Sequence, residues 1–461
     1  MRNTKREWIA FSFYDFAGIA AHLETMAARG WMLERIGALG WQYRRTEPAA
    51  VRFSVTYFAQ ASEFDPAPSE NETVLQDYCA EAGWELVTRS AQMQIFCTHA
   101  QSAVPIETDA AVQLQNIHRA MKKNYLPGQV ILLLLSLFQL GMQVQQFHSR
   151  PVDFFTAPTS LFLVPCWLVV LLLCSLELSS YFRWRRRAVD AAQRSRTLAL
   201  PRSHYRLQRW ALAVVGLGLG CWLWSLRSRR EVLFAAASIL WMALLIFLVN
   251  FLKSLLKRKR VSAAVNRAVT LGSCFLLSFV LMGAVVFGVV RLSRLGALDD
   301  HPPAETYEWH GMTWEVYHDA LPLTVEDLMD TDYPGYSTVA EEAGTALMWR
   351  REYAQEHRLG DTGAPEVHYE IVETDLPALL DLALKEYLSK AERHSDPDAP
   401  NSWEGVPAEA WQAERAFRFQ RGDTPENVYL VCWPDRLAQI RFNWEPTPAQ
   451  MALAATRLKA A

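Results

Sequence analysis

The pattern of apolar residues divides the chain into a polar N-terminal part, an apolar middle and a polar C-terminal part. Five runs approach or reach the roughly 20 mainly apolar residues that a helix needs to cross a bilayer. They cover residues 128–147, 160–181, 210–226, 232–252 and 268–290. We therefore expect a membrane α-helical bundle of about five transmembrane helices, flanked by an N-terminal and a C-terminal α+β domain.

The third run is the weakest of these span predictions. It is the shortest, and Gly216, Gly218 and Gly220 lower its stability as an isolated helix. We expect it to depend on the fourth run as a hairpin partner.

Residues 1–105 contain an internal repeat, in which Ala-x-x-Gly-Trp-x-Leu occurs at residues 27–33 and again at 80–86. Each copy predicts a helix that ends at a left-handed glycine, Gly30 or Gly83, followed by a tryptophan that begins a strand. Alternation predicts further strands at residues 8–14, 41–44, 51–57 and 93–97. We expect a duplicated βαββ domain with one shared antiparallel sheet, followed by a linker over residues 106–127.

These repeats also carry a resemblance to a known family. The residues concerned are Leu23-x-x-Met26-Ala27-x-x-Gly30-Trp31-x-Leu33, the later Gly83-Trp84-Glu85 and the strand Ile95-Phe96. Over about the first quarter of the chain they resemble the uncharacterised bacterial family called domain of unknown function 2812 (DUF2812). The resemblance implies membrane spans after the domain and a protein partner in a PadR-type regulatory or envelope-stress setting. The family supplies no catalytic residues.

Basic residues in the loops predict the orientation, because lysine and arginine beside a span resist translocation. The loops on one side of the five runs hold 18 lysines and arginines, nine of them between Arg183 and Arg209, and the loops on the other side hold six. We expect a multi-pass cell-membrane protein with a cytoplasmic N-terminus and an extracytoplasmic C-terminus. The first span would act as the insertion signal, since no cleavable signal peptide precedes it.

Charge and composition support two environments. From Asp299 onward the chain has 31 acidic and 13 basic residues, against 18 acidic and 33 basic before it. The basic loops are expected to face anionic lipid headgroups, an interpretation that we favour over nucleic-acid binding. The 51% hydrophobic content excludes wholesale disorder, and seven scattered cysteines without a CxxC pair exclude a disulfide framework.

Residues 300–461 are predicted to form an acidic α+β domain with its own core. Alternating β-prone residues predict strands at 307–317, 366–373, 416–419, 428–433 and 437–444. Helices are expected at 325–329, 340–356, 376–391 and 448–458.

The candidate ligand site is a cleft between the two N-terminal repeats. It would use the aromatic residues Trp31, Trp41, Tyr43, Trp84 and Phe96. Ring faces attract organic cations, so the cleft would take an apolar or cationic small molecule. Core packing is the competing role of these side chains.

A second candidate is a polar site inside the membrane, formed by Glu177 and Asn250. An intramembrane carboxylate is a functional candidate by default. Glu177 lies near the cytoplasmic end of its run, however, so a paired or snorkelled interface residue competes with an ion-relay role.

Other motifs favour structural roles. Thr324 and Asp327 predict a helix N-cap rather than a calcium site formed with the neighbouring acidic residues. His301, His310 and His318 lack the HExxH or cysteine context of a zinc site, and Gly422 in an Arg-Gly-Asp string suits a hairpin turn. No complete catalytic signature is present, so we expect no catalytic residues, metal or cofactor.

The sequence thus favours a non-enzymatic sensor or regulatory protein that couples an extracytoplasmic domain to a cytoplasmic ligand-binding or protein-binding domain. A transport accessory protein or small transporter is the alternative, with Glu177 and Asn250 on its polar path. An extracytoplasmic enzyme is a third possibility.

Overall fold

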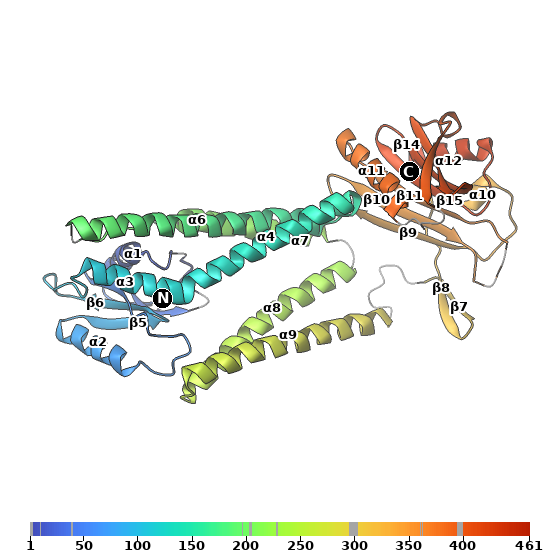
Figure 1. The fold of residues 1–461 in the computed structure, drawn as a ribbon. Coiled ribbons are helices and arrows are strands. Elements are labelled where there is room, and N and C mark those ends of the chain that lie inside the picture. The colour runs from blue at the N-terminus through green and yellow to red at the C-terminus, as the bar shows by residue number, and fades with distance from the viewer. Residues whose placement is uncertain are drawn as a thin grey trace. The chain divides into compact units, whose positions relative to one another are not determined.

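The structure is a computed structural model with two compact units (Figure 1). It describes residues 3–9, 11–37, 40–195, 197–201, 205–226, 229–294, 303–359, 361, 363–393 and 400–461. The first unit comprises Met1–Gln139, Cys166–Leu223 and Glu231–Leu292, and the second comprises Leu140–Pro165, Trp224–Arg230 and Ser293–Ala461.

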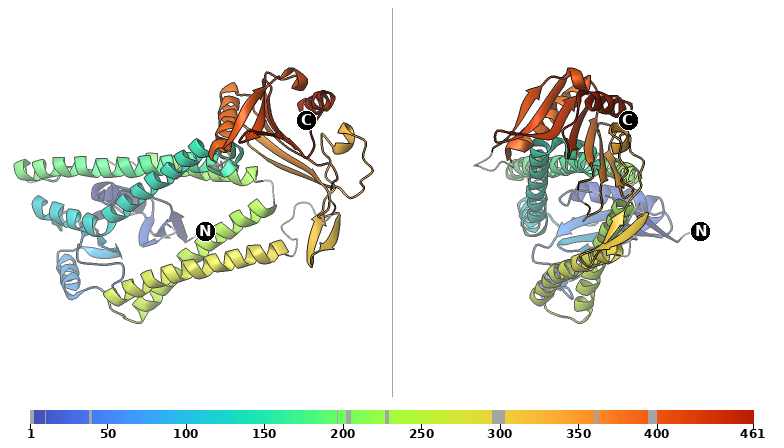
Figure 2. Two further views of the ribbon diagram at one scale, coloured as in Figure 1. Left: turned by 45° about the vertical axis from the view of Figure 1, so that its right-hand side comes forward. Right: turned by 90° about the vertical axis from the view of Figure 1, so that its right-hand side faces the viewer.

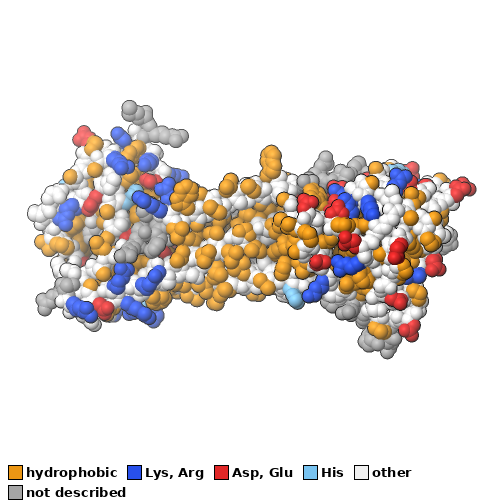
Figure 3. Space-filling model, turned by 90° about the horizontal axis from the view of Figure 1, so that it is seen from above, with side chains coloured by type: hydrophobic (Ala, Val, Ile, Leu, Met, Phe, Trp, Pro, Cys, Tyr) orange, Lys and Arg blue, Asp and Glu red, His pale blue; other side chains and the backbone are white. Residues whose placement is uncertain are grey.

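Five helices among the described residues are long and apolar enough to cross a membrane, as the hydrophobic runs predict. These are α4 (Leu126–Ser149), α6 (Pro158–Ser195), α7 (Tyr205–Ser225), α8 (Arg229–Arg258) and α9 (Ala263–Arg294). Large apolar side chains cover the exposed surface of the helical part of the molecule (Figure 3). In α9 the exposed apolar side chains include Phe275, Phe279 and Phe287. Such faces are stable in lipid and not in water, so these helices are suited to membrane insertion.

The N-terminal elements occur in the order strand, helix, strand, strand, twice over. The first set is β1 (Thr4–Glu7), α1 (Phe16–Ala28), β2 (Trp31–Gly37) and β3 (Gly40–Arg45); the second is β4 (Arg52–Tyr57), α2 (Glu70–Glu81), β5 (Glu85–Ser90) and β6 (Met93–Thr98). Each set forms its own antiparallel sheet, with the orders β1-β3-β2 and β4-β6-β5. The expectation of one shared sheet is therefore corrected: β2 and β5 contact each other, but the paired strands of the described residues stay within each set.

Residues 8–14 are not the first strand, which is Thr4–Glu7 instead. Trp8 is exposed, but Phe11, Phe13 and Tyr14 pack in the core: Tyr14 is 1% exposed, and its ring centroid lies 5.2 Å from that of Tyr181. Tyr57 donates a hydrogen bond to the backbone carbonyl of Phe13 at 2.5 Å. These tertiary contacts override the strand propensity of the aromatic run.

Both repeated glycines end their helices in the left-handed conformation, as predicted. The φ angle is +79° at Gly30 and +81° at Gly83. Their surroundings differ, however. A Cβ on Gly30 would lie 2.7 Å from the backbone oxygen of Thr46, whereas a Cβ on Gly83 would meet nothing within 4 Å.

This difference predicts unequal effects of one substitution. Gly83→Ala should lower the free energy of unfolding by about 1–2 kcal/mol, the cost of a left-handed alanine. Gly30→Ala should cost about 2–4 kcal/mol, because the clash with Thr46 adds to that strain. Chemical denaturation of the two variants tests this order, and equal losses would contradict it.

Residues 106–127 form part of the N-terminal domain instead of a linker. They contain α3 (Ala110–Ala120) and a π-helical turn (Met121–Tyr125) that continues into α4. Leu114, Ile117 and Met121 are buried in the core that α1 shares with both sheets. α2 lies on the other face of the second sheet, where Cys79 packs with Trp84 and Phe96. We refer to residues 3–127 as the N-terminal domain.

The C-terminal domain is built on a seven-stranded antiparallel sheet with the order β12-β13-β14-β15-β11-β10-β9 (Figure 2). Its strands are β9 (Ser337–Gly344), β10 (Trp349–Glu356), β11 (Val367–Glu373), β12 (Asn401–Val406), β13 (Arg415–Arg421), β14 (Thr424–Cys432) and β15 (Arg436–Phe442). β7 (Glu305–Trp309) and β8 (Met312–Val316) form a separate hairpin, so the expected strand 307–317 turns at His310 and Gly311. The helices are α10 (Val325–Leu328), α11 (Pro377–Arg393) and α12 (Pro448–Ala460), with a 3-10 turn at Glu409–Trp411.

The helix expected over residues 340–356 is wrong, because residues 340–344 lie in β9, residues 349–356 form β10, and residues 345–348 connect the two strands. Alanine and glutamate in this segment favour a helix in isolation. β10 instead pairs with β9 on one side and β11 on the other, and it buries Tyr353 and Gln355 on one face. Long-range pairing and burial therefore override the local propensity.

Alternate residues of the sheet bury two separate cores. Ile371, Val431 and Ala438 pack with α10 and α12 on one face. Val372, Leu430 and Leu437 pack with α11 on the other. The sheet is consequently covered on both faces, by α10 and α12 on one side and by α11 on the other (Figure 1).

Candidate functional site

A short helix, α5 (Pro151–Thr156), docks on the α11 face of the C-terminal sheet. It occupies the loop between α4 and α6 and belongs to the second unit. Val152 is 2% exposed and packs in the same cluster as Met348 and Val372. The burial of this side chain contributes about 1.5–3 kcal/mol to docking.

Hydrogen bonds fix the backbone of α5. The Val152 N–H donates to Glu386 Oε2 at 2.7 Å, which satisfies a donor at the start of the helix. Thr345 Oγ1 donates to the Phe155 carbonyl at 2.6 Å. These bonds attach both ends of the short helix to the C-terminal domain.

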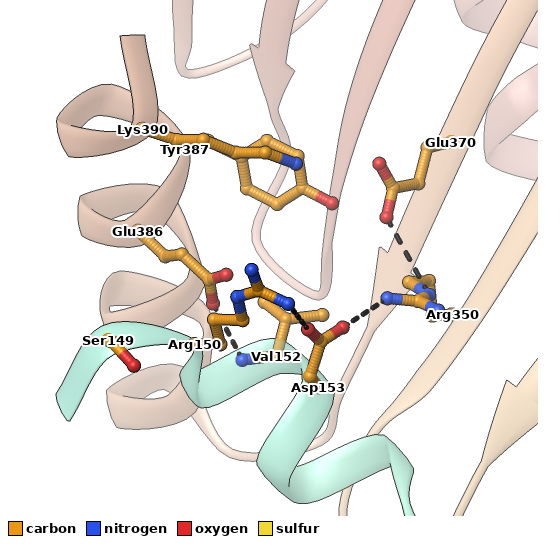
Figure 4. A pocket seen from close by; sticks show the side chains of 9 residues that line it. All are labelled: Ser149, Arg150, Val152, Asp153, Arg350, Glu370, Glu386, Tyr387 and Lys390. Carbon is orange, nitrogen blue, oxygen red and sulfur yellow. Dashed lines mark hydrogen bonds and ion pairs between the residues drawn. The ribbon is translucent and has the colours of Figure 1, made fainter. Parts of the chain in front are cut away.

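Arg350 is the centre of an ion-pair network at the place where α5 docks on the C-terminal sheet. Its guanidinium lies 2.5 Å from Asp153 Oδ1 and 3.8 Å from Glu370 Oε1 (Figure 4). It also lies 3.1 Å from Glu352 Oε1. Arg150 approaches Asp153 from the solvent side at 3.8 Å. Asp153 is therefore the link through which α5 joins the charges of the sheet.

The network borders a cavity of about 400 Å³ (Figure 4). Its lining residues are Ser149, Arg150, Val152, Asp153, Arg350, Glu370, Glu386, Tyr387 and Lys390. Three carboxylates and three cationic side chains face one another here, so the cavity suits a small polar molecule that carries both signs of charge. No group of three histidine, cysteine or acidic side chains in the described part of the chain is arranged to hold a metal ion.

Two residues that line the cavity, Glu370 and Tyr387, have shifted pKa values. Burial raises the pKa of Glu370. This effect is larger than the opposing effects of the Tyr387 hydrogen bond and of the cations Arg350 and Lys390, which lower the pKa. Burial and the Glu370 charge raise the pKa of Tyr387 well above its ordinary value. Tyr387 consequently stays protonated and donates to Glu370.

The C-terminal end of α6 packs into the core of the N-terminal domain, within the first unit. Tyr181, Trp184 and Ala188 are each at most 1% exposed and lie in its main core. The Trp184 Nε1 donates to the Ala199 carbonyl at 2.8 Å. The sequence analysis missed this contact, although the spacing of these residues among arginines places them on one helical face.

Comparison with known proteins identifies the same N-terminal part of the chain. Residues 15–127 match the DUF2812 family. Its description is a protein of unknown function, and the resemblance expected from the glycine-tryptophan repeat is confirmed. No curated protein and no solved structure matches the chain. We refer to residues 15–127 as the DUF2812 region.

The five aromatic residues of the expected cleft lie in different places of the DUF2812 region. Trp41 and Tyr43 are buried in the main core, whereas Trp84 and Phe96 are buried beneath α2. Trp31 is half-buried, with the Arg45 guanidinium 5.0 Å from its ring centroid. The structure thus does not bring these rings together around one cleft.

Glu177 and Asn250 are also in different environments. Glu177 is 5% exposed and accepts hydrogen bonds from Tyr125 at 3.2 Å and Gln208 at 3.3 Å. Asn250 is exposed and donates to the Ile246 carbonyl of its own helix at 2.8 Å. Glu177 is held as a paired residue, and the described contacts do not connect it to Asn250.

Asn266 is one buried polar residue that the sequence analysis missed. Its side chain donates to the Phe64 carbonyl at 3.1 Å and accepts from Thr270 at 3.1 Å. Asn266 thus attaches the start of α9 to the DUF2812 region. Nothing in the local sequence distinguishes it from other polar residues at span ends.

The structural interpretation of the remaining motifs agrees with the fold. Thr324 and Asp327 form a reciprocal capping box at α10, and Gly422 turns between β13 and β14 with φ +59°. His310 and His318 are exposed, and His301 lies outside the described residues.

Proposed function

We propose that this protein is a non-enzymatic membrane regulatory protein that couples the C-terminal domain to the DUF2812 region. The observation that supports this proposal is the docking of α5, directly before α6, on the C-terminal sheet. The last turns of α6 are part of the N-terminal core. The helix α6 therefore begins directly after the segment that docks on the C-terminal domain, and it ends in the core of the N-terminal domain.

The proposed topology follows from the span number and from these contacts. Five spans put the α5 loop and the C-terminal domain on one side of the membrane and the N-terminal domain on the other. Lys253 of α8 lies 3.3 Å from Glu63, and Asn266 of α9 bonds to Phe64, so the α8–α9 turn contacts the N-terminal domain. The basic residues of the loops favour a cytoplasmic location of that side, where they would face anionic headgroups.

Two finer features belong to the same proposal. The matching orders β1-β3-β2 and β4-β6-β5 support a duplicated βαββ origin for the N-terminal domain. Its cytoplasmic partner would be a regulatory protein of the PadR-type setting that the family resemblance implies, and the host would be bacterial.

The mechanism requires two states that the signal stabilises unequally. A polar molecule in the 400 Å³ cavity would compete with Asp153 and Glu386 for their partners in the network. Release of these contacts would free α5 and change the restraint on α6. The N-terminal core would then respond through Tyr181 and Trp184.

Asp153→Lys is the direct test of this coupling. It places a cation beside Arg150 and Arg350, so α5 should undock through repulsion and loss of the ion pair. In nanodiscs, amide hydrogen exchange of residues 150–157 should accelerate at least tenfold, as expected for a loss of about 1.4 kcal/mol or more. Exchange at residues 110–121 and 181–188 should change as well.

The control is Asp423→Lys, which makes the same charge change in the exposed β13–β14 turn. It should alter neither segment. If Asp153→Lys releases residues 150–157 while exchange in the N-terminal domain stays at the wild-type rate, the coupling proposal fails.

A further inference from the structure

A second cavity lies within the N-terminal domain, and none of the five aromatic residues of the expected cleft lines it. Its volume is about 430 Å³, and it lies between the end of β4, the following loop, α2 and α3. Tyr57, Phe58, Leu75 and Ile106 supply apolar walls. A cavity of this size and character suits a small molecule with an apolar body.

Glu107 provides the anionic group of this cavity. Asn116 and Gln113 hydrogen-bond its carboxylate, but Oε2 is buried without a hydrogen-bond partner among the described residues. Burial raises the pKa of Glu107 to about 7. A buried acceptor without a donor is destabilising, and a bound ammonium group would supply both the donor and the countercharge.

The neighbouring charges leave Glu107 available for this role. Asp109 Oδ1 already accepts from the Ala111 and Val112 N–H groups as the N-cap of α3. Arg119 is exposed at the border of the cavity. We propose that this cavity binds a small organic cation, with its ammonium group on Glu107 and its apolar body against Tyr57 and Phe58.

The site has a direct connection to the membrane helices. The loop that follows Phe58 receives hydrogen bonds from Lys123 Nζ at the carbonyls of Ala59, Gln60 and Ala61. The same loop is attached to α8 and α9 through Glu63 and Phe64. A ligand in the cavity would therefore alter the contacts of the α8–α9 turn, independently of the docking of α5 on the C-terminal domain.

Benzylamine, with benzyl alcohol as its neutral analogue, tests the proposal on the full chain in nanodiscs at pH 8. Isothermal titration should show benzylamine binding at least tenfold tighter than benzyl alcohol, with slower hydrogen exchange in residues 56–62. Glu107→Gln should remove this preference for the amine. Asp77→Asn, the same charge change on the exposed face of α2, should retain it.

A second variant separates loss of recognition from misfolding. Leu75→Trp fills the cavity while leaving Glu107 in place, so it should abolish binding of both probes. Equal benzylamine affinity in the wild type and Glu107→Gln would overturn the proposal, as would the absence of binding at millimolar concentrations. If the amine binds but Asp153→Lys leaves the N-terminal domain unchanged, the cation site stands and the transmembrane coupling falls.

Discussion

Trp184→Ala should lower the free energy of unfolding of the N-terminal domain by about 3–5 kcal/mol, the usual cost of removing a buried tryptophan. The side chain is 1% exposed, its ring centroid lies 5.1 Å from that of Tyr14, and its Nε1 donates to Ala199. The truncation creates a cavity and leaves that carbonyl without its donor. Pulse proteolysis of the full chain in denaturant, with cleavage followed inside residues 3–127, measures the loss.

Phe182→Ala is the matched control for this prediction. Phe182 is the nearby large aromatic residue on the opposite face of α6 and is 47% exposed. Its truncation should change the stability of the N-terminal domain by about 0.5 kcal/mol or less. Similar losses in the two variants would show that α6 is not a specific part of the domain core, and would remove one end of the proposed coupling.

Glu107→Gln should stabilise the N-terminal domain at pH 8, by up to about 3 kcal/mol. The pKa of Glu107 is about 7 in the folded chain, above its ordinary value of 4.5, because burial disfavours the charged form. Between these pH values the folded state holds more protons than the unfolded state. Stability from this group is therefore present below pH 4.5 and is lost as the pH rises through 7.

Urea denaturation of wild type and variant between pH 4.5 and 8 tests this sign. The difference in the free energy of unfolding between the variant and the wild type should be near zero at pH 4.5 and should grow until about pH 7. Tyr57 and Cys79, which face Glu107 from β4 and α2, have raised pKa values through burial and stay neutral over most of this range. His22, whose pKa burial lowers, gives an opposite slope that is common to both proteins and cancels.

A flat difference across this range would show that Glu107 is not held in a desolvated site. A stabilising substitution at a single carboxylate is typical of a residue retained for binding rather than for folding. The pH series thus tests the electrostatic basis of the cation site without any ligand.

Local signals made several parts of this protein predictable. The apolar runs have the length that a bilayer requires, so five helices could be assigned from composition alone. Gly30 and Gly83 mark helix ends because a left-handed residue is needed there. Asp327 caps its helix through a bond to a residue only three positions away. In each case the deciding feature is local in the sequence: it is contained in one apolar run or in one helical turn.

Tertiary contacts decided the remainder. Residues 340–344 and 349–356 form strands because β10 pairs with both β9 and β11, and the rings of the expected cleft separate because the two sheets bury them in different cores. Val152 meets Glu386 across 234 residues of sequence, and Glu107 loses its solvent only when α3 packs beside β4. Such pairings depend on burial between distant segments, which the order of residues within either segment does not specify.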